Sequence, residues 1–204
     1  MSNDSFGPKL GYCPSHRVYR RGYLPHIDAP WHPQMVTWRL EDALPESVRR
    51  RMRSESGRHP RRGSELAMAD PWLDAGHGEC ILQDPVNAQL VLDTLLHDTG
   101  RRYLLMAWVV MPNHVHVVVK PYATQPLSRI IGTWKSVSAH RIQKRRGRRG
   151  RLWQRGYFDR LIRNDRHLAQ TVLYIENNPV RAGLVDTPED WPWSSAQEDL
   201  DQAT

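Results

Sequence analysis

Apolar and polar residues alternate along several short runs of this chain, and such alternation predicts strands. The runs are rich in β-branched and aromatic residues. Met111-Pro112-Asn113 separates two of them and is short enough for a tight connection between antiparallel partners. The expected strands are 34–40, 103–110, 115–119 and 153–163.

Apolar residues at helical spacing predict three helices between and after these strands. Asp84 has the character of an N-cap and is followed by proline at the first helical position, while Gly100 ends that helix. A second helix follows Pro126 and runs from Leu127 to about Arg145. The third is capped by Asn164 or Asp165, buries Leu168, Val172 and Ile175, and ends at Pro179.

The order strand, helix, strand, strand, helix, strand is the β-α-β-β-α-β pattern of a ferredoxin-like fold. We therefore expect an α+β protein with a four-stranded antiparallel sheet and an added C-terminal helix. Residues 1–34 show no period and predict an extended N-terminal arm. The domain would span 35–185, with an insertion at 41–83, and 186–204 would form a tail.

Composition narrows the class of partner. The 204 residues carry a formal net charge of +7, which favours a polyanionic partner without distinguishing DNA, RNA and anionic membrane. The two cysteines, Cys13 and Cys80, lack the spacing of a disulfide framework or a structural zinc site. The sequence shows neither a signal peptide nor an apolar run near the ~20 residues of a membrane helix, so we expect a cytoplasmic, nucleoid-associated protein.

The strand that begins at His114 carries the candidate chemistry. Side chains alternate faces along a strand, so His114 and His116 share one face while Val115, Val117 and Val119 supply an apolar underside. Two imidazoles roughly 7 Å apart along a strand can converge on one divalent cation.

The remaining ligand must come from elsewhere, and the candidate lies near the C-terminus. Tyr174 and Asn178 are four residues apart in a segment that reads as helix, so they would share a face. They place a phenol beside an amide oxygen that could complete a metal site. Mg²⁺ or Mn²⁺ suits such a set, with Mn²⁺ the better match to imidazole.

Three sequence blocks in this order carry a resemblance to a known family. They are Met-Pro-Asn-His-Val-His at 111–116, Trp-Gln-Arg-Gly-Tyr-Phe-Asp at 153–159 and Tyr-Ile-Glu-Asn-Asn-Pro-Val-Arg-Ala-Gly-Leu-Val at 174–185; Asp-Trp-Pro-Trp-Ser-Ser follows at 190–195. The chain resembles the HUH single-strand endonucleases with one tyrosine, and among them the IS200-like, REP-associated tyrosine transposases. It has Asn178 where the insertion-sequence members have glutamine, a feature of the REP-associated group.

The resemblance implies a metal-dependent single-strand DNA endonuclease and strand transferase. Tyr174 would attack a phosphate in hairpin or REP-type palindromic DNA and form a 5′-phosphotyrosine, with a free 3′-hydroxyl on the other product. The metal would be held by His114, His116 and Asn178. The chain would work as a monomer or homodimer, and the residues identify no general base.

Basic residues in two parts of the chain are candidates for DNA contact. Alternatives remain open for each part: the arm could pack on its own domain, and the arginine-rich run after the second helix could be a solvated loop. We interpreted that run as a loop because it contains glycines. The candidates are Arg20, Arg21, Lys135, Arg141, Lys144, Arg145, Arg146, Arg148, Arg149 and Arg151.

Two other functions compete with the enzyme. A protein derived from this fold could hold hairpin DNA or RNA without cutting it, and it would bind independently of metal. A small-molecule metallohydrolase fits the arginine-rich run poorly. Histidines outside the pair, His26, His32, His140 and His167, are expected at the surface, and Tyr157 is a competing nucleophile that reads as a strand residue.

Overall fold

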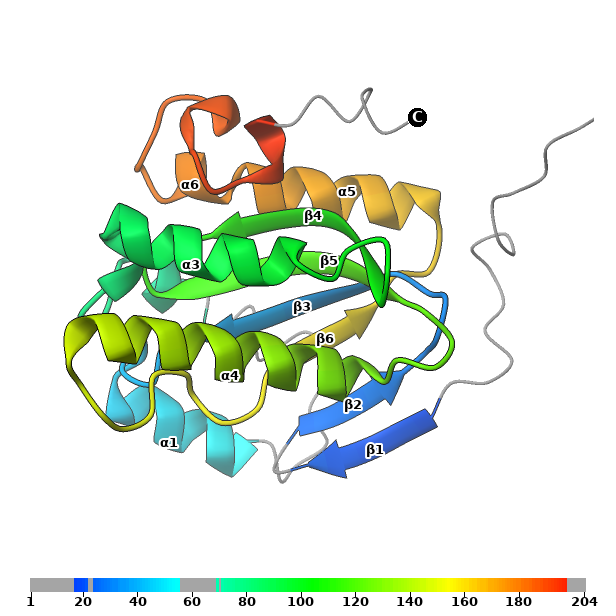
Figure 1. The fold of residues 1–204 in the computed structure, drawn as a ribbon, viewed down its shortest axis with the longest axis horizontal. Helices are drawn as coiled ribbons and strands as arrows, with labels where there is room; N and C mark the ends of the chain where they lie inside the picture. The colour runs from blue at the N-terminus through cyan, green and yellow to red at the C-terminus, as the bar shows by residue number, and fades with distance from the viewer. Residues whose placement is uncertain (1–16, 22–23, 56–68, 70, 198–204) are drawn as a thin grey trace, which may run out of the picture.

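The computed structural model describes residues 17–21, 24–55, 69 and 71–197. Its centre is a four-stranded sheet in the order β4-β5-β3-β6, and all three neighbouring pairs are antiparallel (Figure 1). The strands are β3 (Gln34–Arg39), β4 (Tyr103–Val110), β5 (His114–Pro121) and β6 (Phe158–Leu161). This order and these orientations confirm the ferredoxin-like arrangement.

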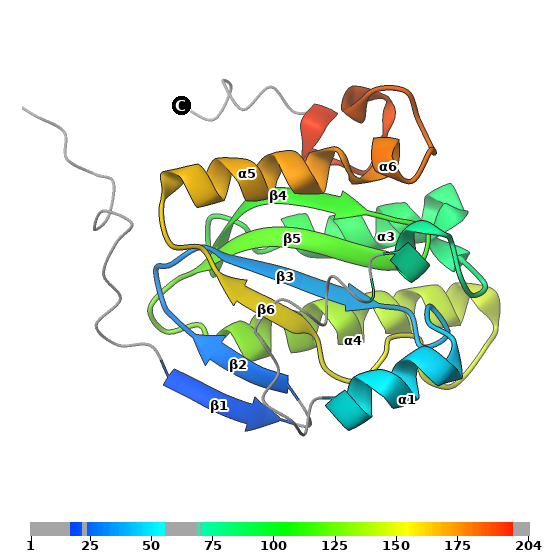
Figure 2. The same ribbon diagram turned by 180° about the vertical axis from the view of Figure 1, so that it is seen from behind.

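Helices cover both faces of this sheet. α3 (Pro85–Leu96) and α4 (Leu127–Arg146) cross the front face in Figure 1, while α5 (Asp165–Glu176) lies over the opposite face beside β4 (Figure 2). α1 (Glu46–Glu55) and the short helix η1 (Ile81–Gln83) belong to the expected insertion. The chain continues through α6 (Asn178–Arg181), η2 (Pro188–Asp190) and η3 (Ser195–Gln197).

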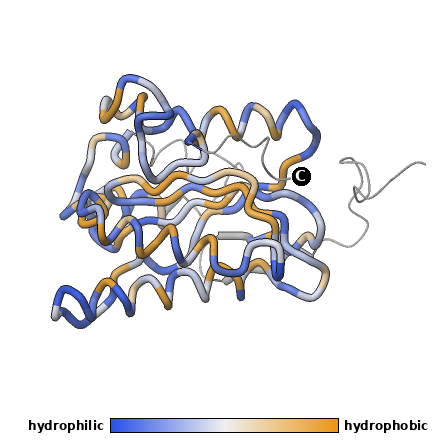
Figure 3. The backbone as a smooth tube through the Cα atoms, turned by 45° about the horizontal axis from the view of Figure 1, so that its top comes forward, coloured by the Kyte–Doolittle hydropathy of each residue, from blue (hydrophilic) through white to orange (hydrophobic). Residues whose placement is uncertain are grey.

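The two faces of β5 divide as the alternation predicts. Val115, Val117 and Val119 pack into the larger core with residues of α3 and α4. Val118 packs on the other side with Ile175 of α5, in a smaller core. Apolar stretches therefore run along the sheet and line the inward sides of the helices (Figure 3).

Capping explains where the helices begin. The Asp84 side chain accepts a hydrogen bond from the backbone N–H of Val86, and the Asn164 side chain accepts one from His167, as both N-cap predictions require. α4 ends at Gly147, whose φ of 60° lies in the left-handed region that glycine adopts without steric cost. α3 ends at Leu96, four residues before the expected end at Gly100.

Several segments differ from the sequence prediction. The run at 153–163 forms a strand only at Phe158–Leu161, and Trp153 instead makes an isolated bridge with Leu40. The expected arm contains a hairpin of β1 (Arg17–Arg21) and β2 (Leu24–Asp28). The described part of the expected tail, 186–197, packs on the sheet through Trp191, which donates to the carbonyl of Val110. The unit boundaries at 34 and 185 stay predictions.

Two of the histidines expected at the surface are buried. His26 is 1% exposed, and its Nδ1 lies 2.5 Å from Oδ1 of Asp159. The same carboxylate accepts a hydrogen bond from the backbone of Ile27, so it ties β2 to β6. His32 is also buried. The burial of His26 was not visible in the sequence, because it depends on Asp159 in the neighbouring strand β6.

The described residues contain no helix long and apolar enough to cross a membrane.

Candidate functional site

The structure brings the four predicted site residues together on the α5 side of the sheet. The rings of His114 and His116 have centroids 4.6 Å apart, and the ring of Tyr174 lies 5.6 Å from that of His116. His114, His116 and Asn178 are all fully buried, while Tyr174 is half-buried. A phenol sixty residues beyond the His pair has therefore folded back beside it.

Tyr174 and Asn178 do not lie on one continuous helix, which corrects the sequence prediction. α5 ends at Glu176, and Asn177 separates it from α6, which begins at Asn178. Asn177 still donates its backbone N–H to the carbonyl of Leu173, so the chain keeps nearly helical geometry through the break. Pro179 lies inside α6 and does not end the helix, since proline is tolerated in a first helical turn.

Asn113 fixes the proton on His114. Its amide nitrogen donates to the carbonyls of Leu73 and His77, so its oxygen is left as the acceptor for His114 Nδ1, 2.7 Å away. In the neutral ring the Nδ1 atom then carries the hydrogen, and Nε2 presents a lone pair. A hydrogen bond of this kind on the far nitrogen is the usual support of a metal-binding histidine.

Thr37 supports the second imidazole in the same way. It lies directly opposite His116 across the β3–β5 pair, and its hydroxyl is 2.7 Å from His116 Nδ1. Burial lowers the pKa of His116 to about 3, with a smaller contribution from the charge of Arg181. Burial also lowers the pKa of His114 well below its ordinary value. Both rings are therefore neutral at pH 7, which is the form that binds metal.

Four polar atoms at the site are buried without a hydrogen-bond partner among the described residues. They are Nε2 of His114, Nε2 of His116, and Oδ1 and Nδ2 of Asn178. The Asn178 amide is close enough to His114 to act on its pKa, in the raising direction, yet it makes no well-aligned hydrogen bond. Buried polar groups are nearly always satisfied, so an unpaired group at each of three neighbouring residues is a feature that a ligand-binding site would explain.

No cluster of three or more His, Cys, Asp or Glu side chains that could hold a metal occurs in the parts of the chain described here. The Asn178 amide, which lies beside His114, is a further protein group that could bind a cation together with the His pair. Two imidazole nitrogens and one amide oxygen fit Mn²⁺ or Mg²⁺ and leave coordination positions for phosphate oxygens.

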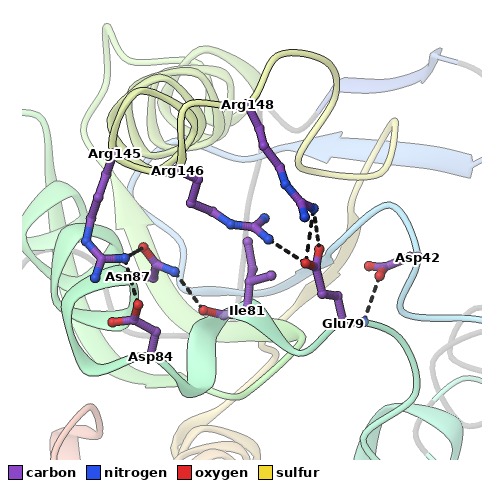
Figure 4. Close-up of polar contacts among 8 residues, drawn as sticks. All are labelled: Asp42, Glu79, Ile81, Asp84, Asn87, Arg145, Arg146 and Arg148. Carbon is purple, nitrogen blue, oxygen red and sulfur yellow. Dashed lines mark hydrogen bonds and ion pairs between the residues drawn. The ribbon is translucent and has the colours of Figure 1, made fainter.

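Much of the arginine-rich run after α4 is paired with acidic groups of the same chain. Arg145 donates to Asp84 and Asn87, while Arg146 and Arg148 both bind the carboxylate of Glu79 (Figure 4). Residues 144–146 are the last turn of α4, so the loop interpretation is correct only from Gly147 onward. These pairs brace the end of α4 against the segment that leads into α3.

The other candidate DNA contacts divide into four groups. Lys135 donates to the carbonyls of Gln154 and Gly156 and so braces a loop. Arg151 lies 3.6 Å from a carboxylate oxygen of Glu41. Arg20 and Arg21 belong to β1, and their side chains are outside what the structure describes. The remaining side chains are exposed and make no hydrogen bond or ion pair with the described residues; they are those of Arg141, Lys144 and Arg149.

Part of the chain resembles a known family of proteins. Residues 89–178 match a family model described as transposase IS200 like. The match covers 90 of the 204 residues. The matched segment contains both histidines, Tyr174 and Asn178.

Two curated relatives are named as REP-associated tyrosine transposases. The chain is 30% identical to one from Haemophilus influenzae over 105 residues, which cover 47% of this chain and 60% of that protein. It is 30% identical to one from Escherichia coli over 101 residues, covering 49% and 58%. The alignments thus span about three fifths of each relative.

A solved structure of a REP-associated tyrosine transposase bound to a REP hairpin has the same fold. The TM-score is 0.56 at 20% sequence identity, and the match covers 90% of this chain and 85% of the other. This likeness in fold covers a larger share of the chain than the segment 89–178 that matches the family model.

The sequence prediction did not include the residues that contact and orient the candidate ligands and Tyr174. Asn113 and Thr37 are ordinary strand-end and strand residues in the sequence, although Asn113 stands next to His114. Arg181 was visible only as part of the third sequence block, and its guanidinium carbon lies 4.9 Å from the centroid of the Tyr174 ring. A search for polar residues adjacent to a candidate ligand would have found Asn113 but not Thr37, whose neighbour is set by strand register.

Proposed function

We propose that this protein is a metal-dependent single-strand DNA endonuclease and strand transferase that acts on hairpin or REP-type palindromic DNA. The observation that carries the proposal is the set of unpaired, buried polar atoms on His114, His116 and Asn178, beside the phenol of Tyr174. The names of the relatives, and the hairpin bound to the protein of similar fold, support this choice of substrate.

His114, His116 and Asn178 would hold Mn²⁺ or Mg²⁺. The bound cation would polarise the scissile phosphate and offset the charge that builds up on its oxygens. Asn113 and Thr37 keep the two imidazoles in one orientation, with the Nε2 atom of His114 as acceptor, so the ligands are pre-organised before any metal arrives.

Tyr174 would supply the nucleophile. Its phenol loses a proton as the oxygen forms a bond to phosphorus, the bond from phosphorus to the 3′-oxygen breaks, and that oxygen takes up a proton, so the step consumes no net proton. The products are a 5′-phosphotyrosine and a free 3′-hydroxyl. A second 3′-hydroxyl can attack the phosphotyrosine and release the enzyme, so joining needs no nucleotide triphosphate.

The test is covalent capture of DNA. A hairpin oligonucleotide with a single-stranded flank, incubated with the protein and Mn²⁺, should give an adduct that survives denaturing electrophoresis. Tyr174→Phe should abolish the adduct and retain DNA binding, because it removes only the hydroxyl. Tyr157→Phe is the matched control: Tyr157 is also half-buried but packs on His26, with ring centroids 4.1 Å apart, and its loss should leave the adduct.

An adduct that survives Tyr174→Phe would reject the assignment of the nucleophile. Wild-type protein that binds the hairpin with equal affinity in Mn²⁺ and in chelator, and forms no adduct, would support the alternative of a non-cleaving hairpin-binding protein. The exposed basic side chains of α4 favour nucleic-acid binding in either case.

A further inference from the structure

One stretch of the expected insertion contacts both halves of the candidate site. Residues 71–77 include a short helical segment, 71–74. The carbonyls of Leu73 and His77 accept hydrogen bonds from Asn113, which in turn holds His114. The carboxylate of Asp74 lies 3.3 Å from the guanidinium of Arg181, which in turn lies against Tyr174. A segment that the sequence presents as a surface insertion is therefore in contact with the supports of both the metal ligands and the nucleophile.

Arg181 is placed by α6, the same turn that begins with Asn178. Residues three apart in a helix lie on one face, so α6 carries a candidate ligand and a guanidinium on the same side. The guanidinium has the Tyr174 ring within 4.9 Å of its central carbon and the Asp74 carboxylate at 3.3 Å. A planar guanidinium can stack on an aromatic face and bind a carboxylate at the same time, which a lysine ammonium does less well.

We propose that Asp74 and Arg181 are positioning residues for Tyr174, and that the 71–77 segment helps to orient both Tyr174 and His114. This inference rests on the proposed function. A half-buried tyrosine in the last turn of α5 has rotamers that point away from the His pair, and attack on phosphorus tolerates little misplacement. Arg181 packs against the ring, and Asp74 prevents the guanidinium from swinging into solvent.

The two residues lie on either side of the segment that matches the IS200-like family model, which covers 89–178. Asp74 is 107 positions from Arg181, so nothing local in the sequence links them. The side chain of Asp74 is 19% exposed and that of Arg181 is 44% exposed. The bridge is therefore at the rim of the site, where DNA could reach the tyrosine without displacing the buried ligands.

The kinetic test compares adduct formation in full-length variants at saturating hairpin DNA and Mn²⁺. We expect Asp74→Asn to lower the rate about tenfold and Arg181→Met about a hundredfold, because small errors in the position of a nucleophile have effects of this size. The DNA concentration for half-saturation should change less than about twofold, and Asp74→Glu should recover most of the rate.

Asp98→Asn is the matched control. It weakens a similar carboxylate–arginine pair, Asp98 with Arg102 at 3.2 Å, that lies outside the site. It should leave the rate of adduct formation unchanged. Equal rates for Asp74→Asn, Asp98→Asn and wild type would overturn the inference while leaving the proposed function intact. The inference would also be overturned if Asp74→Asn and Arg181→Met raised only the DNA concentration for half-saturation and left the rate unchanged, since that result indicates a DNA contact.

A measurement without DNA separates this inference from the proposed function. In protein labelled with 3-fluorotyrosine, the ¹⁹F resonance of Tyr174 can be assigned with Tyr174→Phe. It should shift and broaden in Asp74→Asn and Arg181→Met, because the ring then samples more than one rotamer, and it should be unaffected in Asp98→Asn. If the resonance is unchanged in both Asp74→Asn and Arg181→Met, the inference is wrong, whether or not the wild type forms an adduct.

Discussion

Replacing Asn178 by leucine should stabilise the metal-free protein while removing its response to Mn²⁺. Asn178 is fully buried, and both polar atoms of its side chain lack a well-aligned partner among the described residues. Leucine has the same branching at Cγ and a similar volume, so it can fill the space without polar atoms. A substitution of a buried residue beside two histidines would ordinarily be expected to destabilise the fold.

The magnitude follows from the cost of unpaired polar groups. A buried donor or acceptor without a partner costs about 1–3 kcal/mol. Because the amide also interacts weakly with His114, we take the gain from Asn178→Leu as roughly 2 kcal/mol. For a chain of 204 residues this corresponds to a rise in Tm of about 4–8 °C.

The assay is thermal unfolding with and without Mn²⁺. Wild-type protein at a Mn²⁺ concentration one hundred times its Kd should gain about 2.7 kcal/mol, because the metal binds only the folded state. Asn178→Leu should start from a higher Tm in chelator and gain little from Mn²⁺. The difference between the Tm of Asn178→Leu and that of the wild type should therefore shrink or change sign when Mn²⁺ is added.

Asn87→Leu provides a matched control. Asn87 is 2% exposed, but its amide donates to Ile81 and accepts from Arg145. Because it has partners to lose, its replacement should destabilise the protein by about 1–3 kcal/mol and leave the Mn²⁺ response unchanged. If Asn178→Leu destabilises the metal-free protein as much as Asn87→Leu, or keeps the full Mn²⁺ response, the reasoning from unpaired atoms is wrong.

Three further results are expected. The pKa of His116 is lowered from 6.5 to about 3, so the unfolded chain binds a proton that the folded chain does not, and stability is lost as pH falls through this window. His116→Gln should reduce the dependence of the unfolding free energy on pH in this range by at most about 1.4 kcal/mol per pH unit, as measured by urea unfolding at a series of pH values. Lys135→Met should lower stability by about 1–2 kcal/mol, because two carbonyls lose their donor, without changing the salt dependence of DNA binding. Glu79→Gln should free Arg146 and Arg148 for phosphates and steepen the salt dependence by about one to two units of slope, measured by fluorescence anisotropy; an unchanged slope would show that these arginines serve only as a brace.

Local patterns in the sequence were sufficient for the order and orientation of the main elements. The period of two in β5 separates His114 and His116 from the valines, and the structure has the two sets on opposite faces. Asp84 and Asn164 mark their helix starts, because an N-cap is a property of a few consecutive residues. These features depend on φ/ψ preference and side-chain alternation, which a short stretch of chain carries by itself.

Features that depend on distant partners could not be predicted in this way. Whether Arg145, Arg146 and Arg148 face DNA or the chain's own carboxylates is decided by how the end of α4 docks against residues 79–87.

For this protein, then, the sequence determined which side chains share a face, and therefore that two imidazoles and a phenol were available. Only the tertiary structure decided that Asn113 and Thr37 orient the imidazoles and that Asp74 reaches Arg181 beside Tyr174. The physical reason is the sequence separation over which each kind of interaction acts. Alternation and capping act over a few residues. Strand register instead pairs Gln34 with Leu161, and the docking of the insertion joins Asp74 to Arg181, 107 positions away.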